Sequence, residues 1–316
     1  MKSFTNHKQS QESIARMVEL FFAPFHMKHC RELTEGYFNV AYEICLDNGK
    51  EVILKIAPLK EMRVMTYEKN IMFAEVEAMK RVRQAGGIPV PAVIGYDDSC
   101  TICASPYFFM EKLEGRSLHA EKGSLTADQI ADIYTEVGRI NRKINEINCP
   151  CFGYPGQRAF QGEAWFPVFQ KMLEAGIEDA CNGNVDLKIP IDRLRSRLQE
   201  DKGIFEEVTQ PRLVHWDCWD GNIFVKDGQV EGIIDWERSL WGDPLMEVGF
   251  RMYADNTCFL QGYGRTGLTE GEWRRALWYD IYLLILVSLE CAYRKYETLD
   301  TYNWATGLLE EQFRKV

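Results

Sequence analysis

Three polar residues within one short segment have the types and the spacing that phosphoryl transfer requires. Asp217 and Asn222 stand five residues apart, and Asp235 follows the apolar run 230–234. Short apolar runs flank the turn Lys226-Asp-Gly228, which predicts a hairpin that carries these three side chains at one end. Carboxylate and amide oxygens suit Mg²⁺, and a carboxylate can accept the proton of an attacking hydroxyl group. The segment therefore predicts a site that moves a phosphoryl group.

The order of these residues resembles that of known kinases. The pattern His215-x-Asp217-x4-Asn222, followed by Ile-Ile-Asp235, matches the catalytic loop and the metal-binding Asp of protein kinases. Residues 236–244 contain Trp-Glu and then Gly-Asp-Pro, and they resemble the aminoglycoside phosphotransferase and choline kinase group instead. This resemblance implies that Asp217 is the catalytic base and that Asn222 and Asp235 hold Mg²⁺. It also implies that His215 orients the loop through hydrogen bonds.

Departures from the protein-kinase pattern indicate a small acceptor. Trp216 and Trp219 stand where protein kinases carry Arg and often carry Lys, respectively. No activation loop with an Ala-Pro-Glu ending follows Asp235. The resemblance therefore implies a small-molecule acceptor rather than a protein substrate.

The same resemblance assigns nucleotide contacts upstream of the loop. Lys55, in the expected strand Val-Ile-Leu-Lys-Ile, would contact the α- and β-phosphates. Glu75 on the next helix would pair with this lysine, and Glu77 is the alternative. The turn that contains Gly36 and Asn39 would cover the phosphates through its backbone N–H groups.

The segment 107–115 resembles the hinge on which such enzymes hold the adenine base. Glu111 and Leu113 would supply backbone hydrogen bonds, and Met110 would lie beside the base. The resemblance therefore implies ATP or GTP as the nucleotide, bound together with Mg²⁺.

The elements that must position these residues can be placed along the chain. Strands are predicted at 40–46 and 51–56, joined across Asp47-Asn-Gly49, and further strands at 90–96 and 107–112. Helices are predicted at about 11–23, 66–85, 126–147, 163–180, 190–206 and 271–296. We therefore expect an α+β, bilobal protein-kinase-like fold. Its parts are a small β-rich N-lobe (1–113), a hinge at about 108–115 and a larger, mainly helical C-lobe (114–316).

The chain is acidic, with 37 basic and 47 acidic residues and a formal net charge of −10. This balance disfavours nucleic acid and anionic membranes as partners, since phosphate binding needs a basic face. It suits a cationic acceptor, although an acidic surface that aids solubility is an equal alternative. Asp220, Glu237 and Asp243 are the candidate acceptor-binding carboxylates. A turn cap is the alternative for Asp243, and a place beside the metal or on the solvated surface is the alternative for Glu237.

The C-terminal part adds aromatic residues, among them Trp273, Tyr282 and Trp304. They either line an acceptor pocket or, at helical spacing, pack in the core. Asp280 and Glu290 stand between them and suit an amine-bearing acceptor or a helix surface.

The ten cysteines predict free thiols rather than disulfides. The start of the chain is polar and lacks the apolar core of a signal peptide, and no CxxC pair occurs at zinc spacing. These features predict a reducing, cytoplasmic location. The most apolar run, Ile281–Val287, is too short to span a bilayer and predicts a core helix.

The sequence thus predicts an ATP- or GTP-dependent, Mg²⁺-dependent O-phosphotransferase for a small, cationic molecule, with an aminoglycoside-type antibiotic favoured. Kinases of choline, ethanolamine, homoserine or sugars are the alternatives. A non-catalytic nucleotide-binding protein would lack Lys55, Asp217 or Asp235, and all three are present. No obligate protein partner is expected.

Overall fold

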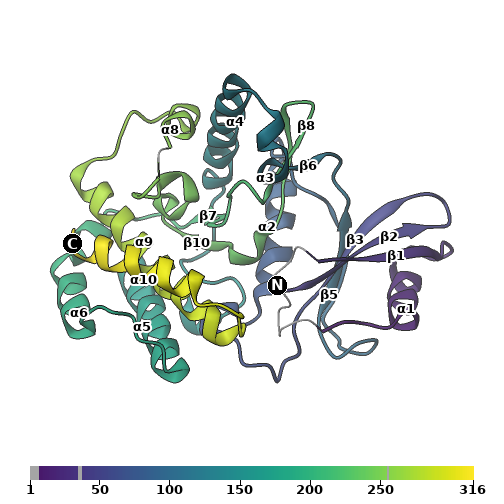
Figure 1. Cartoon of the computed structure of the whole chain (residues 1–316), viewed down its shortest axis with the longest axis horizontal. Coiled ribbons are helices and arrows are strands. Elements are labelled where there is room, and N and C mark those ends of the chain that lie inside the picture. Colours follow the sequence, from purple (N-terminus) through teal and green to yellow (C-terminus); the bar gives the residue numbers. More distant parts are fainter. Residues whose placement is uncertain (1–6, 35–37, 255) are drawn as a thin grey trace.

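The computed structural model describes residues 7–34, 38–254 and 256–316. Figure 1 shows a small lobe of strands beside a larger lobe of helices, with helix α2 between them. The α-helices are α1 (Gln11–Phe22), α2 (Ile71–Ala85), α3 (Leu118–Glu121), α4 (Ala127–Asn145), α5 (Trp165–Gly183), α6 (Ile191–Glu200), α7 (Lys202–Phe205), α8 (Thr257–Tyr263), α9 (Glu270–Tyr293) and α10 (Asp300–Phe313). The expected α+β architecture, with a small β-rich part and a larger helical part, is confirmed.

A five-stranded antiparallel sheet in the order β1-β2-β3-β5-β4 forms the small lobe. Its strands are β1 (Met27–Leu33), β2 (Val40–Leu46), β3 (Glu51–Ile56), β4 (Val93–Asp97) and β5 (Tyr107–Glu111). Helix α1 packs on one face, where the rings of Phe22 and Phe109 lie 5.0 Å apart. The expected hairpin strands coincide with β2 and β3. Strand β1 has no clear sequence signal, because it is a polar, largely exposed edge strand.

Hydrogen bonds and an ion pair join the segment before α2 to the large lobe. In the short turn η1 (Thr66–Glu68), the N–H and hydroxyl groups of Thr66 donate to Asp179 of α5, at 2.6 and 2.9 Å. Glu68 pairs with Arg294 at 2.9 Å. The helix expected over 66–85 is therefore divided, since Asn70 adopts a left-handed conformation (φ 57°) between η1 and α2. These contacts hold α2 against the large lobe.

Helix α9 forms the centre of the large lobe. Its residues Ile281, Leu284 and Ile285 are fully buried, and α5 and α10 pack against it. By length and composition α9 is apolar enough to cross a membrane, but 89% of its apolar window is buried inside this structure. The expected core helix is thus confirmed. The helix expected over 190–206 is broken into α6 and α7 at Asp201, whose carboxylate accepts hydrogen bonds from two residues of α9.

The polar residues of the phosphoryl-transfer segment are brought together by a hairpin. Its strands are β8 (Ile223–Lys226) and β9 (Gln229–Ile233), and β6 (Arg116–Ser117) pairs with β8. The short strands β7 (Arg212–Val214) and β10 (Leu240–Gly242) form a separate two-stranded sheet. Ile223 lies opposite Ile233, and the Ile234 N–H donates to the Asn222 carbonyl at 3.0 Å. This register places Asn222 and Asp235 at the same end of the hairpin, as expected.

All ten cysteines are free thiols, as expected. Burial raises the pKa of Cys149 to about 12 and the pKa of the buried Cys218 well above its ordinary value. These two thiols are therefore neutral at physiological pH.

Gly115, where the chain passes from the sheet to the helical lobe, offers a direct test of this fold. Its φ is +74°, and a Cβ there would lie 2.1 Å from the Val225 carbonyl oxygen. The Gly115→Ala substitution should lower the free energy of unfolding by about 2 kcal/mol or more, because it adds a clash to a strained backbone. Chemical denaturation measures this change.

Gly123→Ala is the matched control, since a Cβ at Gly123 meets nothing within 4 Å. Its free energy of unfolding should change by no more than about 0.5 kcal/mol. Equal stability of the two variants would contradict the close approach of Gly115 to Val225.

Candidate active site

Lys55 on β3 is the centre of a buried charge cluster between the lobes. Its Nζ lies 2.6 Å from Glu75 Oε1 on α2 and 2.8 Å from Asp235 Oδ1. Burial opposes the charge of the ammonium group, but the carboxylates of Asp235, Glu75 and Glu237 outweigh it and raise the pKa of Lys55. Glu77, the alternative partner, instead pairs with an arginine of its own helix at 2.7 Å. A lysine held charged in this way can bind the phosphates of a nucleotide.

Glu237 belongs to this lysine cluster, which agrees with the alternative of a place beside the metal. Its Oε2 accepts a hydrogen bond from Asn39 Nδ2 at 2.8 Å. One oxygen each of Glu75, Asp235 and Glu237 lie within 4.8 Å of one another. Burial, together with the negative charge of Asp235, raises the pKa of Glu237 well above its ordinary value. A divalent cation bound among these carboxylate oxygens would relieve their mutual repulsion, so the three residues fit a metal. Gly36, expected in the same turn as Asn39, lies outside the described residues.

Asp217 and Asn222 contact each other across the catalytic loop, residues 215–222. Asn222 Nδ2 donates to the Asp217 carbonyl at 2.8 Å and to Asp217 Oδ2 at 3.3 Å. Since this nitrogen is directed to Asp217, the amide oxygen of Asn222 is the atom suited to a metal. The Asp217 side chain is 24% exposed, and burial raises its pKa to about 6. Asp217 thus combines access with a pKa close to neutrality, as a proton acceptor requires.

His215 links the catalytic loop to β9. Its Nδ1 accepts a hydrogen bond from the Asp217 N–H at 3.2 Å, and its Nε2 lies 3.1 Å from the Ile234 carbonyl oxygen. Burial lowers the pKa of His215 to about 4, so the ring is neutral, and these partners assign its proton to Nε2. The ring packs edge-on against Trp236 at 4.4 Å. This geometry supports the positioning role expected for His215.

Glu247 anchors the catalytic loop, a role that its sequence position does not reveal. Its carboxylate accepts hydrogen bonds from the N–H groups of His215 and Trp216, at 2.9 and 3.0 Å, and from Asn145 Nδ2 at 2.9 Å. Trp216 is held in the left-handed conformation (φ 65°) that glycine adopts more easily, and its ring stacks on Tyr282 at 5.4 Å. The sequence signal for Glu247 is a carboxylate inside an otherwise apolar segment.

Arg238 places a positive charge beside Asp217, and the sequence motif does not indicate it. Its Nε lies 3.9 Å from Asp217 Oδ2, and its Nη2 donates to Glu290 at 2.9 Å. Arg238 lies on the turn η4 (Trp236–Arg238), directly after Asp235. A cation at this place favours the ionised form of Asp217 and opposes the effect of burial.

Strand β5 and the residues after it carry the expected hinge. Met110 is buried, and the Glu111 N–H donates to the Ala92 carbonyl at 2.9 Å. The N–H of Glu111 is therefore already paired within the small lobe. Leu113 packs over Gly232 of β9, where a Cβ would lie 2.6 Å from Leu113 Cδ1. The hinge thus lies against the same hairpin that carries Asp235.

Asp220, expected to bind the acceptor, has partners of its own within the protein. Its Oδ2 pairs with Lys122 Nζ at 2.7 Å, and its Oδ1 accepts a hydrogen bond from the Tyr134 hydroxyl at 2.8 Å. Its carbonyl accepts the His119 N–H at 3.0 Å. The geometry therefore gives Asp220 a structural role that fastens the loop to α3 and α4.

Asp243 is also structural, and the alternative of a turn cap replaces the acceptor-binding role. The side chain is buried, and its Oδ1 accepts the Leu245 N–H at 3.1 Å. Its Oδ2 accepts hydrogen bonds from Arg275 Nε at 3.0 Å and the Tyr279 hydroxyl at 2.8 Å. Three donors satisfy this carboxylate, which leaves it no contact with solvent or an acceptor.

A sequence profile described as "Phosphotransferase enzyme family" matches residues 29–279. The matched range contains the lysine cluster, the hinge and the catalytic loop. The chain belongs to the phosphotransferase enzyme family. The resemblance to this family seen in the sequence is thus confirmed.

Solved structures of kinases share the fold of this phosphotransferase over nearly its whole length. A Thermobifida fusca protein described as a fructosamine-3-kinase aligns with a TM-score of 0.68 and 17% identity, covering 96% of this chain and 100% of that chain. A thermostable mutant of aminoglycoside phosphotransferase APH(4)-Ia, in a ternary complex with AMP-PNP and hygromycin B, aligns with a TM-score of 0.67 and 16% identity, covering 96% and 98%. These similarities confirm the expected kinase-like fold.

A fungal protein is similar over a shorter segment. The "Subtelomeric hrmA-associated cluster protein" of Aspergillus fumigatus is 32% identical over 124 residues. The aligned segment covers 39% of the phosphotransferase and 23% of the fungal protein, so the chain spans less than a quarter of that relative.

The anchor of the catalytic loop can be tested with Glu247→Gln. This variant of the phosphotransferase should lose about 2 kcal/mol of unfolding free energy, because an amide N–H then faces a buried loop N–H. Turnover should fall by about tenfold or more, because the loop that holds Asp217 loses its fixed position. Thermal denaturation and an assay of phosphoryl transfer measure the two effects. Glu311→Gln, on exposed α10, is the control, and wild-type stability of Glu247→Gln would contradict the anchor.

Asp243→Ala distinguishes the structural role of Asp243 from acceptor binding. Removal of the carboxylate leaves Arg275 with only Glu207 and the Ile204 carbonyl as partners and leaves the Tyr279 hydroxyl without an acceptor for its proton, which should lower the free energy of unfolding by about 2 kcal/mol. The KM for the acceptor should not change in the variant that remains folded. The reverse result, wild-type stability with a raised KM, would restore the acceptor role.

Proposed function

We propose that this phosphotransferase transfers the γ-phosphoryl group of ATP to a hydroxyl group of a small molecule, with Mg²⁺ as the metal. The observation that carries the proposal is the junction of two features at one end of the β8–β9 hairpin. The lysine cluster reaches this end through Asp235, and the catalytic loop reaches it through Asn222 and Asp217. GTP is the alternative donor expected from the sequence.

The lysine cluster would hold the nucleotide phosphates and the metal. Lys55, kept charged and oriented by Glu75, would bind the phosphate oxygens. Asn222, Asp235 and Glu237 provide hard oxygen atoms, the donor type that Mg²⁺ prefers. When bound, the metal would neutralise negative charge on the phosphate oxygens.

Asp217 would act on the acceptor hydroxyl. Its pKa of about 6 leaves it mostly ionised at neutral pH, and Arg238 supports that state. The acceptor oxygen forms a bond to the γ-phosphorus while the bond to the bridging oxygen breaks, and ADP leaves. Asp217 orients the hydroxyl and accepts its proton, so proton and phosphoryl group move to different partners.

The acceptor expected from the sequence is an aminoglycoside-type antibiotic, with choline, ethanolamine, homoserine or sugars as alternatives. Similar structures include a streptomycin–ATP complex and a hygromycin B complex of aminoglycoside phosphotransferases, and one protein is described as a fructosamine-3-kinase. Proteins with this fold thus act on more than one class of acceptor. The acceptor of this chain therefore has to be inferred from its own residues. A cytoplasmic location remains part of the proposal, because the free thiols suit a reducing compartment.

Asp217→Asn tests the assignment of the base. Phosphoryl transfer should fall by about 100-fold or more, because the amide cannot accept the proton. The affinity for AMP-PNP should stay within about twofold, because the lysine cluster is unchanged. Coupled detection of ADP and isothermal titration measure the two quantities.

Asp220→Asn is the matched control: Asp220 lies three residues away, and the amide oxygen of Asn can still accept the hydrogen bond from Tyr134 that fastens the loop. Its turnover should remain near that of the wild type. Near wild-type turnover of Asp217→Asn would overturn the assignment. A wild-type protein that binds AMP-PNP but phosphorylates no acceptor would favour the non-catalytic alternative.

A further inference from the structure

The short turn η1 contacts the catalytic loop, although it belongs to the segment that connects β3 with α2. Tyr67, its middle residue, is buried. The guanidinium carbon of Arg238 lies 5.8 Å from the centre of the Tyr67 ring. The Trp216 ring meets the Tyr67 ring edge-on, with centroids 6.4 Å apart. One aromatic ring therefore contacts both the arginine beside Asp217 and the residue that precedes Asp217.

A series of ion pairs leads from η1 to the same arginine. Glu68 Oε1 pairs with Arg294 Nη2 at 2.9 Å, and Arg294 Nη1 lies 3.5 Å from Glu290 Oε1. Glu290 Oε1 also pairs with Arg238 Nη2 at 2.9 Å, and Arg238 Nε lies 3.9 Å from Asp217 Oδ2. Glu68, Arg294 and Glu290 are buried, so solvent screens their charges little. A continuous series of charges thus joins η1 to Asp217.

The backbone of η1 is fixed by residues of the large lobe. Thr66 donates two hydrogen bonds to Asp179 of α5. Gln157 Nε2 donates to the carbonyl oxygens of Thr66 and Tyr67, at 3.0 and 3.3 Å. Because its backbone has these fixed partners, η1 holds the Tyr67 ring in one place against the catalytic loop.

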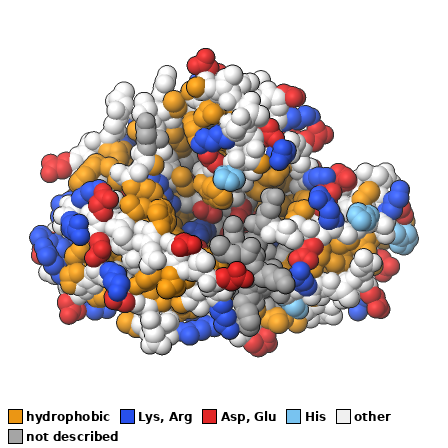
Figure 2. All heavy atoms as spheres, viewed as in Figure 1, with side chains coloured by type: hydrophobic (Ala, Val, Ile, Leu, Met, Phe, Trp, Pro, Cys, Tyr) orange, Lys and Arg blue, Asp and Glu red, His pale blue; other side chains and the backbone are white. Residues whose placement is uncertain are grey.

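The same segment continues into α2, whose Glu75 binds Lys55. Apolar side chains of α2, among them Met72, Val76 and Met79, pack in the core of the large lobe, whereas one face of the sheet and α1 share a separate core. In Figure 2, acidic and basic side chains lie beside one another at the hollow between the two lobes. The segment from η1 to α2 thus contacts both the lysine cluster and the catalytic loop.

We propose that Tyr67 is a positioning residue for phosphoryl transfer, whose ring holds Arg238 and the catalytic loop in place before any nucleotide binds. The inference rests on the proposed function and adds a residue to the same reaction. Protein kinases control the order of their site through a phosphorylated activation loop, and no Ala-Pro-Glu ending of such a loop follows Asp235. A turn held by the large lobe provides this order without a modification.

Hydrogen exchange of the free protein, followed by mass spectrometry, tests the proposal without an acceptor. Tyr67→Leu removes the ring and should speed exchange of the amides in residues 215–222 by about tenfold, because the loop loses a packing partner. Tyr67→Phe keeps the ring and should exchange like the wild type. Arg294→Lys keeps a charge but loses the fork that spans Glu68 and Glu290, so it should also speed this exchange. It keeps the test decisive if Tyr67→Leu does not fold.

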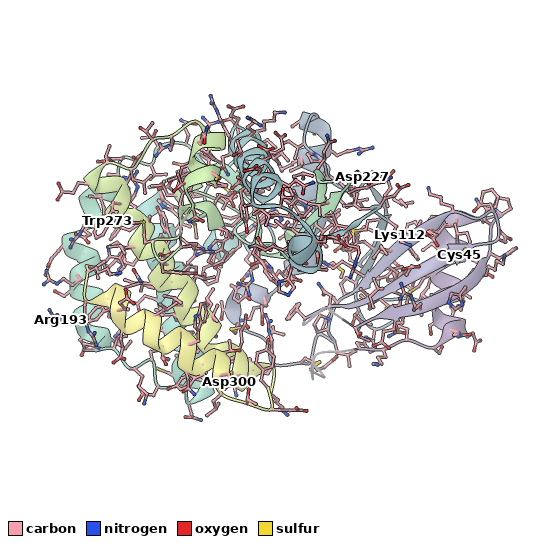
Figure 3. The ribbon with its side chains drawn as sticks, turned by 45° about the horizontal axis from the view of Figure 1, so that its top comes forward. Cys45, Lys112, Arg193, Asp227, Trp273 and Asp300 are labelled. Carbon is pink, nitrogen blue, oxygen red and sulfur yellow. The ribbon has the colours of Figure 1, made fainter. Side chains whose placement is uncertain are left out.

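Tyr107→Leu is the matched control, because Tyr107 is a buried tyrosine in the separate core of the sheet and α1. Figure 3 shows Cys45 of the sheet and Arg193 of the large lobe at opposite ends of the molecule. Tyr107→Leu should lower the stability of the protein and leave the exchange of residues 215–222 unchanged. Equal exchange of this loop in Tyr67→Leu and Tyr107→Leu would overturn the proposal.

Kinetics test whether Tyr67 acts through Arg238. The full chain is assayed for ADP formation with Mg²⁺, ATP and four acceptor probes, which are kanamycin, choline, homoserine and glucose. Tyr67→Leu should lower kcat by about tenfold and leave the KM for ATP within about twofold, because the lysine cluster keeps its own bonds. In Tyr67→Leu/Arg238→Ala the loss should be about fivefold smaller than the product of the two single losses. A loss equal to that product would overturn the action through Arg238.

The two experiments separate this inference from the proposed function. A wild-type protein that phosphorylates none of the probes would count against the proposed function, while hydrogen exchange of the catalytic loop would still decide the role of Tyr67. Phosphoryl transfer that is unaffected by Tyr67→Leu would uphold the proposed function and overturn the role of Tyr67.

Discussion

A buried charge must have a partner of opposite sign or several hydrogen-bond partners, and this constraint shapes the whole active site. Lys55 reaches from the sheet to Glu75 on α2 and to Asp235 on the hairpin, so one ammonium group joins three elements. Glu247 satisfies its charge with loop N–H groups and thereby fixes the loop that carries Asp217. The bonds that compensate these charges are the same bonds that position the catalytic groups.

Because buried charges are paired, the net charge of the whole chain does not predict the charge of the active site. A net charge of −10 suggests a cationic ligand, but the carboxylates nearest to Asp217 are held by arginines or backbone N–H groups. The lysine cluster differs, since three carboxylates share one lysine and burial raises the pKa of Glu75 and of Glu237. Excess negative charge is therefore concentrated where a metal and phosphates would bind.

Local pattern in the sequence was enough to predict β2, β3 and the β8–β9 hairpin, and the resemblance to kinases implied the pairing of Lys55 with Glu75. These features depend on alternation, turn residues and motif order, which a single segment contains. The role of Asp220 could not be predicted, because it depends on Lys122, a partner distant in the sequence. The turn cap at Asp243 was an alternative that the sequence offered, but its bond with the distant Arg275 was not. Arg238 and Glu247 were missed for the same reason, since their functions come from contacts made by folding. The role of a polar residue near a motif can therefore be assigned only when its partners in the folded structure are known.

The most direct test of the account is ³¹P NMR of the wild-type protein and Lys55→Met with ATP, Mg²⁺ and a hydroxyl acceptor. The account predicts that the wild type forms one phosphomonoester for each ADP, because the lysine cluster and the catalytic loop act as one site. Lys55→Met should lose both signals, since the phosphates lose the cation that binds them. Release of inorganic phosphate without an ester, or ester formation that persists in Lys55→Met, would contradict the account.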